Sequence, residues 1–184
     1  MVVTGEDLSG ILKVILIFSV FAFQHSVLAS RSFKALAVKA IGERPVKGFY
    51  RLFYTFWSFL TTSFAIYLLL QIPDRVLWRA PQWLAIPMHG VQVLGLMLGV
   101  MAFRRFDGLE FLGIRQALLY LKGQPIGGDI EGISQRGLIT DGIYGIVRHP
   151  MYLGGILIFT FEPNLTRNFL TVTILADLYF LYGA

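Results

Sequence analysis

The sequence contains no cysteine among its 184 residues. This absence excludes disulfide bonds, thiolate metal ligands and a thiol nucleophile. Charge is also scarce, because Asp, Glu, Lys and Arg make up only 15% of the chain, whereas soluble domains average about 25%. Hydrophobic residues make up 55%, and the mean hydropathy is +0.65. A soluble protein of this size has too small an interior for so many apolar side chains, so we expect lipid to be the solvent.

Five apolar stretches are predicted to cross a hydrocarbon core of about 30 Å, which takes roughly 20 helical residues. They cover residues 11–29, 52–72, 83–103, 143–161 and 168–184. Lipid does not tolerate unpaired backbone polar groups, so all five are predicted to be helices. We therefore expect an all-α integral membrane protein with a single membrane domain over 1–184. Acidic residues precede the first stretch and no small-residue cleavage site follows it, which predicts a retained helix and not a signal peptide.

Basic residues predict the orientation in the membrane. The segments after the first and third stretches, together with Arg148 near the start of the fourth stretch, hold 12 of the 16 Lys and Arg residues. We therefore expect the N-terminus outside and both segments in the cytoplasm, in the inner (plasma) membrane of a prokaryote. The net charge is +5, but this placement of the charges indicates contact with the lipid bilayer and no nucleic-acid partner.

The second cytoplasmic segment, 104–142, is too long for a simple connector. Its first part, 106–121, is predicted to be an amphipathic helix at the interface, because four apolar residues recur at helical spacing: Phe111, Ile114, Leu118 and Leu121. Its second part, 122–142, contains six glycines and many polar residues. We expect this Gly-rich loop to bind any water-soluble ligand.

The most informative run of residues is Gly137-Leu-Ile-Thr-Asp-Gly-Ile-Tyr-Gly-Ile-Val-Arg-His-Pro-Met-Tyr-Leu-Gly154. Pro150 keeps His149 out of helical geometry and suits the first turn of a helix. The free N–H groups of that turn, together with Arg148, are suited to bind a carboxylate. Tyr144 and Tyr152 offer ring faces to an adenine or a sulfonium. The residues alone leave an alternative open, in which the basic pair anchors a proline-kinked helix and the tyrosines join an aromatic belt.

These residues carry a family resemblance. Arg148-His-Pro-Met-Tyr152, preceded by Leu138-Ile-Thr-Asp-Gly-Ile-Tyr144, resembles the cofactor signature of the isoprenylcysteine carboxyl methyltransferase and phospholipid methyltransferase superfamily. Its members are integral membrane enzymes that use S-adenosyl-L-methionine. The resemblance implies that this cofactor binds to Leu138, Ile139, Tyr144, Arg148, His149, Pro150 and Tyr152.

Two further segments narrow the resemblance. They are Phe23-Gln-His-Ser-Val-Leu-Ala29 and Phe106-Asp-Gly-Leu-Glu-Phe-Leu-Gly-Ile-Arg-Gln116. Both are similar to the methanethiol S-methyltransferase and NnrU-like branch of the superfamily. The resemblance therefore covers most of the chain, from about Phe21 to the last apolar stretch.

The C-terminus departs from the family pattern. The superfamily usually carries two adjacent glutamates just after the last helix, which help to hold the amino group of the cofactor. This chain stops at Ala184 without such a pair. Glu162 and Asp177 are poor substitutes, because we expect the first on the outer side and the second in mid-helix. Either the sequence is incomplete or the site lacks its acidic half, and the uncharged end of the last stretch favours the first interpretation.

The family implies in-line attack of an acceptor on the methyl group of the cofactor. A thiol acceptor must lose its proton, so a base or a positive charge nearby promotes the reaction. His25 and Arg115 are the predicted catalytic residues, and His149 is a further candidate. Polar side chains inside a membrane are costly and are functional candidates for that reason. The alternative for His25 is an interfacial hydrogen bond to the backbone.

These features predict a membrane-embedded methyltransferase that uses S-adenosyl-L-methionine and acts on a small or lipophilic thiol. One alternative is an enzyme that methylates a carboxylate or a lipid amine. Another is a non-catalytic, methyltransferase-like subunit with partners in a larger membrane complex, which the missing glutamate pair favours. We predict no metal site.

Overall fold

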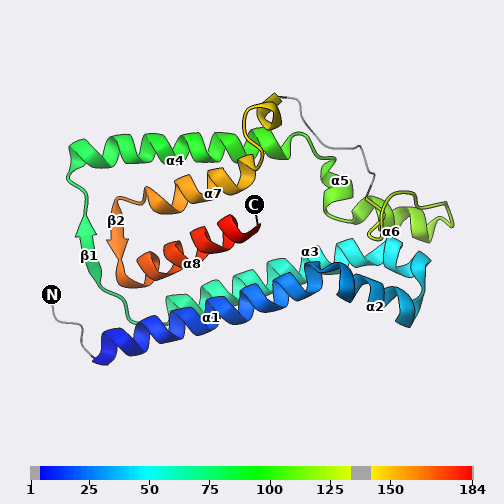
Figure 1. Cartoon of the computed structure of the whole chain (residues 1–184), viewed down its shortest axis with the longest axis horizontal. Helices are drawn as coiled ribbons and strands as arrows, with labels where there is room; N and C mark the ends of the chain where they lie inside the picture. Colours follow the sequence, from blue (N-terminus) through cyan, green and yellow to red (C-terminus); the bar gives the residue numbers. More distant parts are fainter. Residues whose placement is uncertain (1–4, 134–141, 184) are drawn as a thin grey trace. The chain divides into compact units, whose positions relative to one another are not determined.

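The computed structural model of the chain describes residues 5–133 and 142–183. These residues form eight helices, one 3-10 turn and two short strands (Figure 1). In chain order the elements are α1 (Gly5–Ala29), α2 (Arg31–Ile41), α3 (Glu43–Leu70), β1 (Val76–Arg79), α4 (Gln82–Phe103), α5 (Gly108–Phe111), α6 (Ile114–Leu121), η1 (Gly142–Gly145), α7 (Pro150–Thr160), β2 (Asn164–Thr166) and α8 (Arg167–Gly183).

Three helices, α1, α3 and α4, are long and apolar enough to cross a membrane. The prediction of an all-α membrane protein is confirmed at this level. The other two predicted spans form shorter helices, α7 of 11 residues and α8 of 17. At about 1.5 Å per residue, α7 is only about 16 Å long, or roughly half of the hydrocarbon thickness.

Two predicted elements have other boundaries in the structure. The helix expected over 143–161 begins only at Pro150, because residues 142–145 form the 3-10 turn η1. The amphipathic helix expected over 106–121 is divided into α5 and α6 at Gly113, whose φ is +83°. A Cβ atom at Gly113 would lie 2.7 Å from the carbonyl carbon of Arg51, so α3 approaches the backbone too closely for any side chain.

The chain divides into two compact units. The first unit comprises residues 1–20, 65–105 and 139–184, and the second comprises 21–64 and 106–138. Helices α1 and α3 contribute residues to both units. The single membrane domain remains a prediction.

In the first unit α7 lies between α4 and α8 (Figure 1). A Cβ atom at Gly154 of α7 would lie 2.6 Å from the carbonyl oxygen of Gly95 in α4. Small residues at such a contact let two helices in a membrane approach closely. Strands β1 and β2 pair antiparallel, so they join the connection before α4 to the connection before α8.

In the second unit a buried carboxylate fastens the described part of the Gly-rich loop to two helices. Glu131 is 4% exposed and lies 3.1 Å from Lys34 Nζ of α2 and 3.6 Å from an Arg51 guanidinium nitrogen of α3. Asp129 Oδ1 shapes the loop by accepting hydrogen bonds from the N–H groups of Glu131 and Ile133. Specific charges therefore hold residues 129–133 of the loop in place.

Candidate functional site

The first part of the candidate site is the turn that precedes α7. His149 has a φ of −127° and a ψ of 66°, outside helical geometry, and Pro150 opens the helix. The predicted local structure at this proline is confirmed. The N–H groups of the first turn of a helix have no partner within the helix and lie at the positive end of its dipole. The turn therefore favours an anion.

Three rings from α7 and α8 form a stacked series beside this turn. The His149 ring stacks on Tyr152, with 5.6 Å between centroids and an interplanar angle of 11°. Tyr152 in turn stacks on Phe180 of α8 at 5.8 Å and 22°. The predicted cofactor residues His149 and Tyr152 are thus held in one parallel arrangement. Phe180 supports them, and sequence analysis missed it because the pairing of α7 with α8 is not visible in the sequence.

Guanidinium groups supply the positive charge of this region. Arg148 is exposed and makes no hydrogen bond or ion pair with other described residues. Arg105, at the end of α4, packs over Gly142. A Cβ atom added to Gly142 would lie 3.0 Å from Arg105 Cζ. Gly142 has a φ of +59°, so both the space and the backbone conformation favour glycine. The sequence gives no signal that Arg105 lies at this turn, because its contact with Gly142 joins residues that are distant in the chain.

Of the other predicted cofactor residues, the structure describes Tyr144 but not Leu138 and Ile139. Tyr144 is half-buried in η1, before α7. Its phenolic hydroxyl can donate and accept hydrogen bonds. Leu138 and Ile139 lie outside the described residues.

Another group of predicted residues surrounds His25, in the second unit. Its Nε2 atom lies 2.8 Å from the Tyr54 hydroxyl, and its Nδ1 atom lies 3.3 Å from the Ser58 hydroxyl. Phe21 stacks on the ring at 5.5 Å. Both ring nitrogens are therefore paired with side-chain hydroxyls of α3, and the alternative hydrogen bond to the backbone is not observed.

The polar contacts continue one turn further. Trp57 Nε1 donates to Gln24 Oε1 at 2.8 Å, and Gln24 Nε2 donates to Thr61 Oγ1 at 3.1 Å. Sequence analysis missed these partners of α1, although Tyr54, Trp57, Ser58 and Thr61 recur at the spacing of one helix face. The network fixes the orientation of the His25 ring.

Arg115, the other predicted catalytic residue, is held by Asp107. The two side chains form an ion pair of 2.6 Å, and the Arg115 side chain is 52% exposed. Asp107 also caps α5, because its carboxylate accepts from the N–H groups of Leu109 and Glu110. The contacts of His25 are with Phe21, Tyr54 and Ser58, so the structure does not bring the two predicted catalytic residues into contact with each other.

Asp177 and Glu162 lie within hydrogen-bond networks of the first unit. Asp177 Oδ2 accepts from Thr160 Oγ1 at 2.8 Å, and Glu162 Oε2 accepts from Gln92 Nε2 at 3.2 Å. Gln92 Oε1 also pairs with His89 Nδ1 at 2.8 Å. Among residues 5–133 and 142–183, no group of three or more His, Asp or Glu side chains is placed to hold a metal ion.

Comparison with known proteins places these features in a family. Residues 13–159 match the NnrU protein family. The chain is 31% identical to methanethiol S-methyltransferase 2 of Bradyrhizobium diazoefficiens, over 94% of this chain and 62% of that protein. It is 29% identical to methanethiol S-methyltransferase of Pseudomonas deceptionensis, over 92% of this chain and 60% of that protein.

A third relative, methanethiol S-methyltransferase of Mycobacterium tuberculosis, is 26% identical over 91% of this chain and 64% of that protein. The chain thus spans 60–64% of the length of these three curated relatives. No solved structure matches it significantly.

Proposed function

Since the chain belongs to the NnrU protein family, we propose that it is a membrane methyltransferase that transfers a methyl group from S-adenosyl-L-methionine to a small or lipophilic thiol. The names of the relatives support methanethiol as the type of acceptor. The observation that carries the proposal is the turn before α7, where Arg148, which has no partner among the described residues, lies next to a helix N-terminus and a stacked ring series.

The residues of this turn fit the chemical groups of the cofactor. Arg148 and the first turn of α7 match a carboxylate. The faces of His149 and Tyr152 match an adenine or a cationic sulfonium. We propose Leu138, Ile139, Tyr144 and Pro150 as further parts of this site, as the family signature implies. When bound, the cofactor supplies an electrophilic methyl group.

For the acceptor, we propose that His25 acts as the base that removes the thiol proton. Its hydroxyl partners Tyr54 and Ser58 hold the ring in place. Both ring nitrogens are paired, so the thiol displaces the Ser58 hydroxyl, the more distant partner at 3.3 Å, and its proton goes to Nδ1. We propose Arg115 as the positive charge that stabilises the thiolate. Its ion pair with Asp107 fixes the side chain, and its half-exposed guanidinium retains donors for a further anion.

The finer topology is also a proposal. It comprises five crossings in a prokaryotic inner membrane, an external N-terminus, and a cytoplasmic segment 104–142 with an interfacial amphipathic region and a Gly-rich cofactor loop. The three long apolar helices and the concentration of basic residues over 31–51 and after α4 support it.

Binding of S-adenosylhomocysteine to the detergent-purified chain tests the cofactor site. We expect saturable binding by calorimetry, weakened roughly tenfold or more in Arg148→Gln, because a hydrogen bond to a charged group contributes about 1.5–3 kcal/mol. Arg104→Gln is the matched control, because Arg104 is exposed, ends α4 and makes no ion pair with described residues. Equal affinity in both variants would remove the turn from the site. Absence of binding would favour the non-catalytic membrane subunit.

A further inference from the structure

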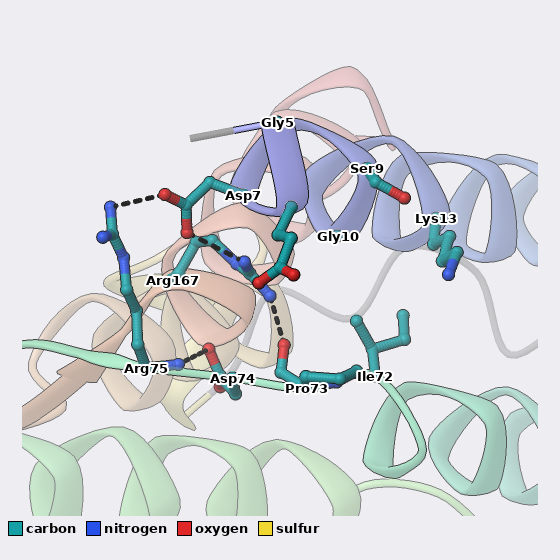
Figure 2. Close-up of a pocket in the computed structure, with 11 residues that line it drawn as sticks. Gly5, Asp7, Ser9, Gly10, Lys13, Ile72, Pro73, Asp74, Arg75 and Arg167 are labelled. Carbon is teal, nitrogen blue, oxygen red and sulfur yellow. Dashed lines mark hydrogen bonds and ion pairs between the residues drawn. The ribbon is translucent and has the colours of Figure 1, made fainter. Parts of the chain in front are cut away.

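A polar pocket lies in the first unit at the N-terminal end of α1. Its volume is about 520 Å³. The first turns of α1, the connection between α3 and β1, and Arg167 at the start of α8 form its walls (Figure 2). None of the predicted cofactor or catalytic residues lines it, so its ligand is independent of the proposed methyl transfer.

The deepest charges of this pocket are neutralised within the protein. Asp7 is 4% exposed and lies 3.0 Å from Arg167 Nη1 and 3.1 Å from Arg75 Nη2. Arg167, which is 8% exposed, also donates to the carbonyl of Pro73 and to Asn168. Figure 2 shows Asp7 between the two arginines. These groups stabilise the fold by pairing with one another, so most of their charge and hydrogen-bonding capacity is already used within the protein.

Two charges of the pocket remain without a partner. Glu6 and Lys13 both line it, both are exposed, and neither forms an ion pair or hydrogen bond with the other described residues. They are seven positions apart, which places them on one face of α1 and separates them by about 10 Å along its axis. Among the described residues, the charged lining consists of three acids and three bases. This neutral sum favours a ligand that itself carries one positive and one negative group.

An apolar groove adjoins the pocket. It has a volume of about 380 Å³ and is lined by Leu8, Leu12 and Leu16, which follow one another at four-residue spacing along α1. These leucines are 54%, 56% and 64% exposed. The groove and the pocket share Gly5, Ser9 and Lys13, so Lys13 lies at the junction of the charged and the apolar surface.

We propose that the pocket and the groove together bind one phospholipid with a zwitterionic headgroup. The ammonium group of the lipid pairs with Glu6, and its phosphate pairs with Lys13. One acyl chain starts beside Leu12, next to Lys13, and continues past Leu16. The order of the charges supports this assignment, because the phosphate of a phospholipid lies between its amine and its acyl chains, as Lys13 lies between Glu6 and the apolar end of the groove. Helix α1 is also a candidate membrane span, whose end belongs at the depth of the headgroups.

Native mass spectrometry of the full chain tests the headgroup. The protein is offered equal amounts of phosphatidylethanolamine and phosphatidylglycerol with identical acyl chains. We expect one phosphatidylethanolamine to be retained at least fivefold in preference, and Glu6→Gln and Lys13→Gln each to reduce its retention at least threefold. Lys122→Gln, an exposed lysine outside both cavities, is the control that leaves retention unchanged. Equal or stronger retention of phosphatidylglycerol, or no effect of Lys13→Gln, would overturn the proposal.

The apolar half of the site has its own test. Leu12→Ala removes three carbon atoms from the groove and should weaken lipid retention at least about fourfold, which is the effect of one buried methylene group. Glycerophosphoethanolamine, which has the headgroup without acyl chains, should fail to displace the lipid. Displacement by this soluble compound, or full retention by Leu12→Ala, would show that no acyl chain occupies the groove.

Discussion

At the scale of single residues, the fit of Arg167 depends on a glycine. A Cβ atom at Gly10 would lie 2.6 Å from Arg167 Cζ, within the buried ion pair of Arg167 with Asp7. A guanidinium that is displaced from its carboxylate leaves both charges poorly solvated, and a buried unpaired charge is costly. The absence of a side chain at Gly10 therefore lets Arg167, at the start of α8, pack against the start of α1 within the first unit.

We predict that Gly10→Ala lowers the free energy of unfolding by about 1–3 kcal/mol, as for other insertions into a packed site. Thermal unfolding of the detergent-purified chain measures this change. Gly90→Ala is the matched control, because nothing lies within 4 Å of a Cβ atom at that position of α4. Alanine is a better helix former than glycine, so the control should be as stable as the original chain or slightly more so. Equal stability of the two variants would contradict this account of Gly10.

Residue-scale predictions from the sequence succeeded where the cause is local. Pro150 has a fixed φ and lacks an N–H group, which suffices to predict that a helix begins there. The partners of His25 could not be predicted in this way. Tyr54 and Ser58 belong to another helix, and which faces of α1 and α3 meet depends on the packing of the second unit.

At the scale of elements, the contact between α4 and α7 is made by glycine backbones. A Cβ atom added to Gly95 would lie 2.7 Å from the carbonyl oxygen of Gly154. One added to Gly154 would lie 2.6 Å from the carbonyl oxygen of Gly95. A backbone oxygen cannot rotate away as a side chain does, so the two helices would have to separate. The contact holds α7, which begins with Pro150 of the candidate cofactor turn.

We predict that Gly154→Ala lowers the unfolding free energy of the first unit by at least about 1–3 kcal/mol and weakens binding of S-adenosylhomocysteine. Gly99→Ala in α4 is the control, because its Cβ atom would have no neighbour within 4 Å. Thermal unfolding tests the packing, and calorimetry tests its consequence for the site. If Gly154→Ala unfolds at the same temperature as Gly99→Ala, the close contact of α4 and α7 is refuted whatever the function of the protein.

The apolar periodicity of the sequence does not predict all boundaries of the elements. The apolar spacing in 106–121 is real, but the helix is divided at Gly113 because the backbone of Arg51 lies against it. The fourth predicted span is shorter than its apolar run, because residues 142–145 form a 3-10 turn. Strands β1 and β2 were not predicted, since each is short and is defined by its pairing with the other. In each case a contact distant in the sequence determines the local structure.

At the scale of the whole molecule, composition predicted the class of protein and motifs predicted the family. The low charge content and long apolar runs reflect the solvent, so an all-α membrane protein followed from the sequence alone. The match of residues 13–159 to the NnrU family confirms the NnrU-like branch, which the sequence analysis inferred from Phe23–Ala29 and Phe106–Gln116. The ring series of His149, Tyr152 and Phe180 and the polar network of His25 needed the structure, because each joins two helices.

The measurement that tests the central proposal most directly is methyl transfer. The purified chain in lipid nanodiscs is given S-adenosyl-L-methionine and methanethiol, and dimethyl sulfide is measured by gas chromatography. We predict that the original chain forms dimethyl sulfide. In His25→Asn the rate should fall by at least about 100-fold, because a general base contributes at least about that factor. Binding of S-adenosylhomocysteine should be unaffected in this variant. Cofactor binding without methylation of methanethiol or a longer alkane thiol would contradict the proposed function, and an unchanged rate in His25→Asn would contradict the assignment of the base.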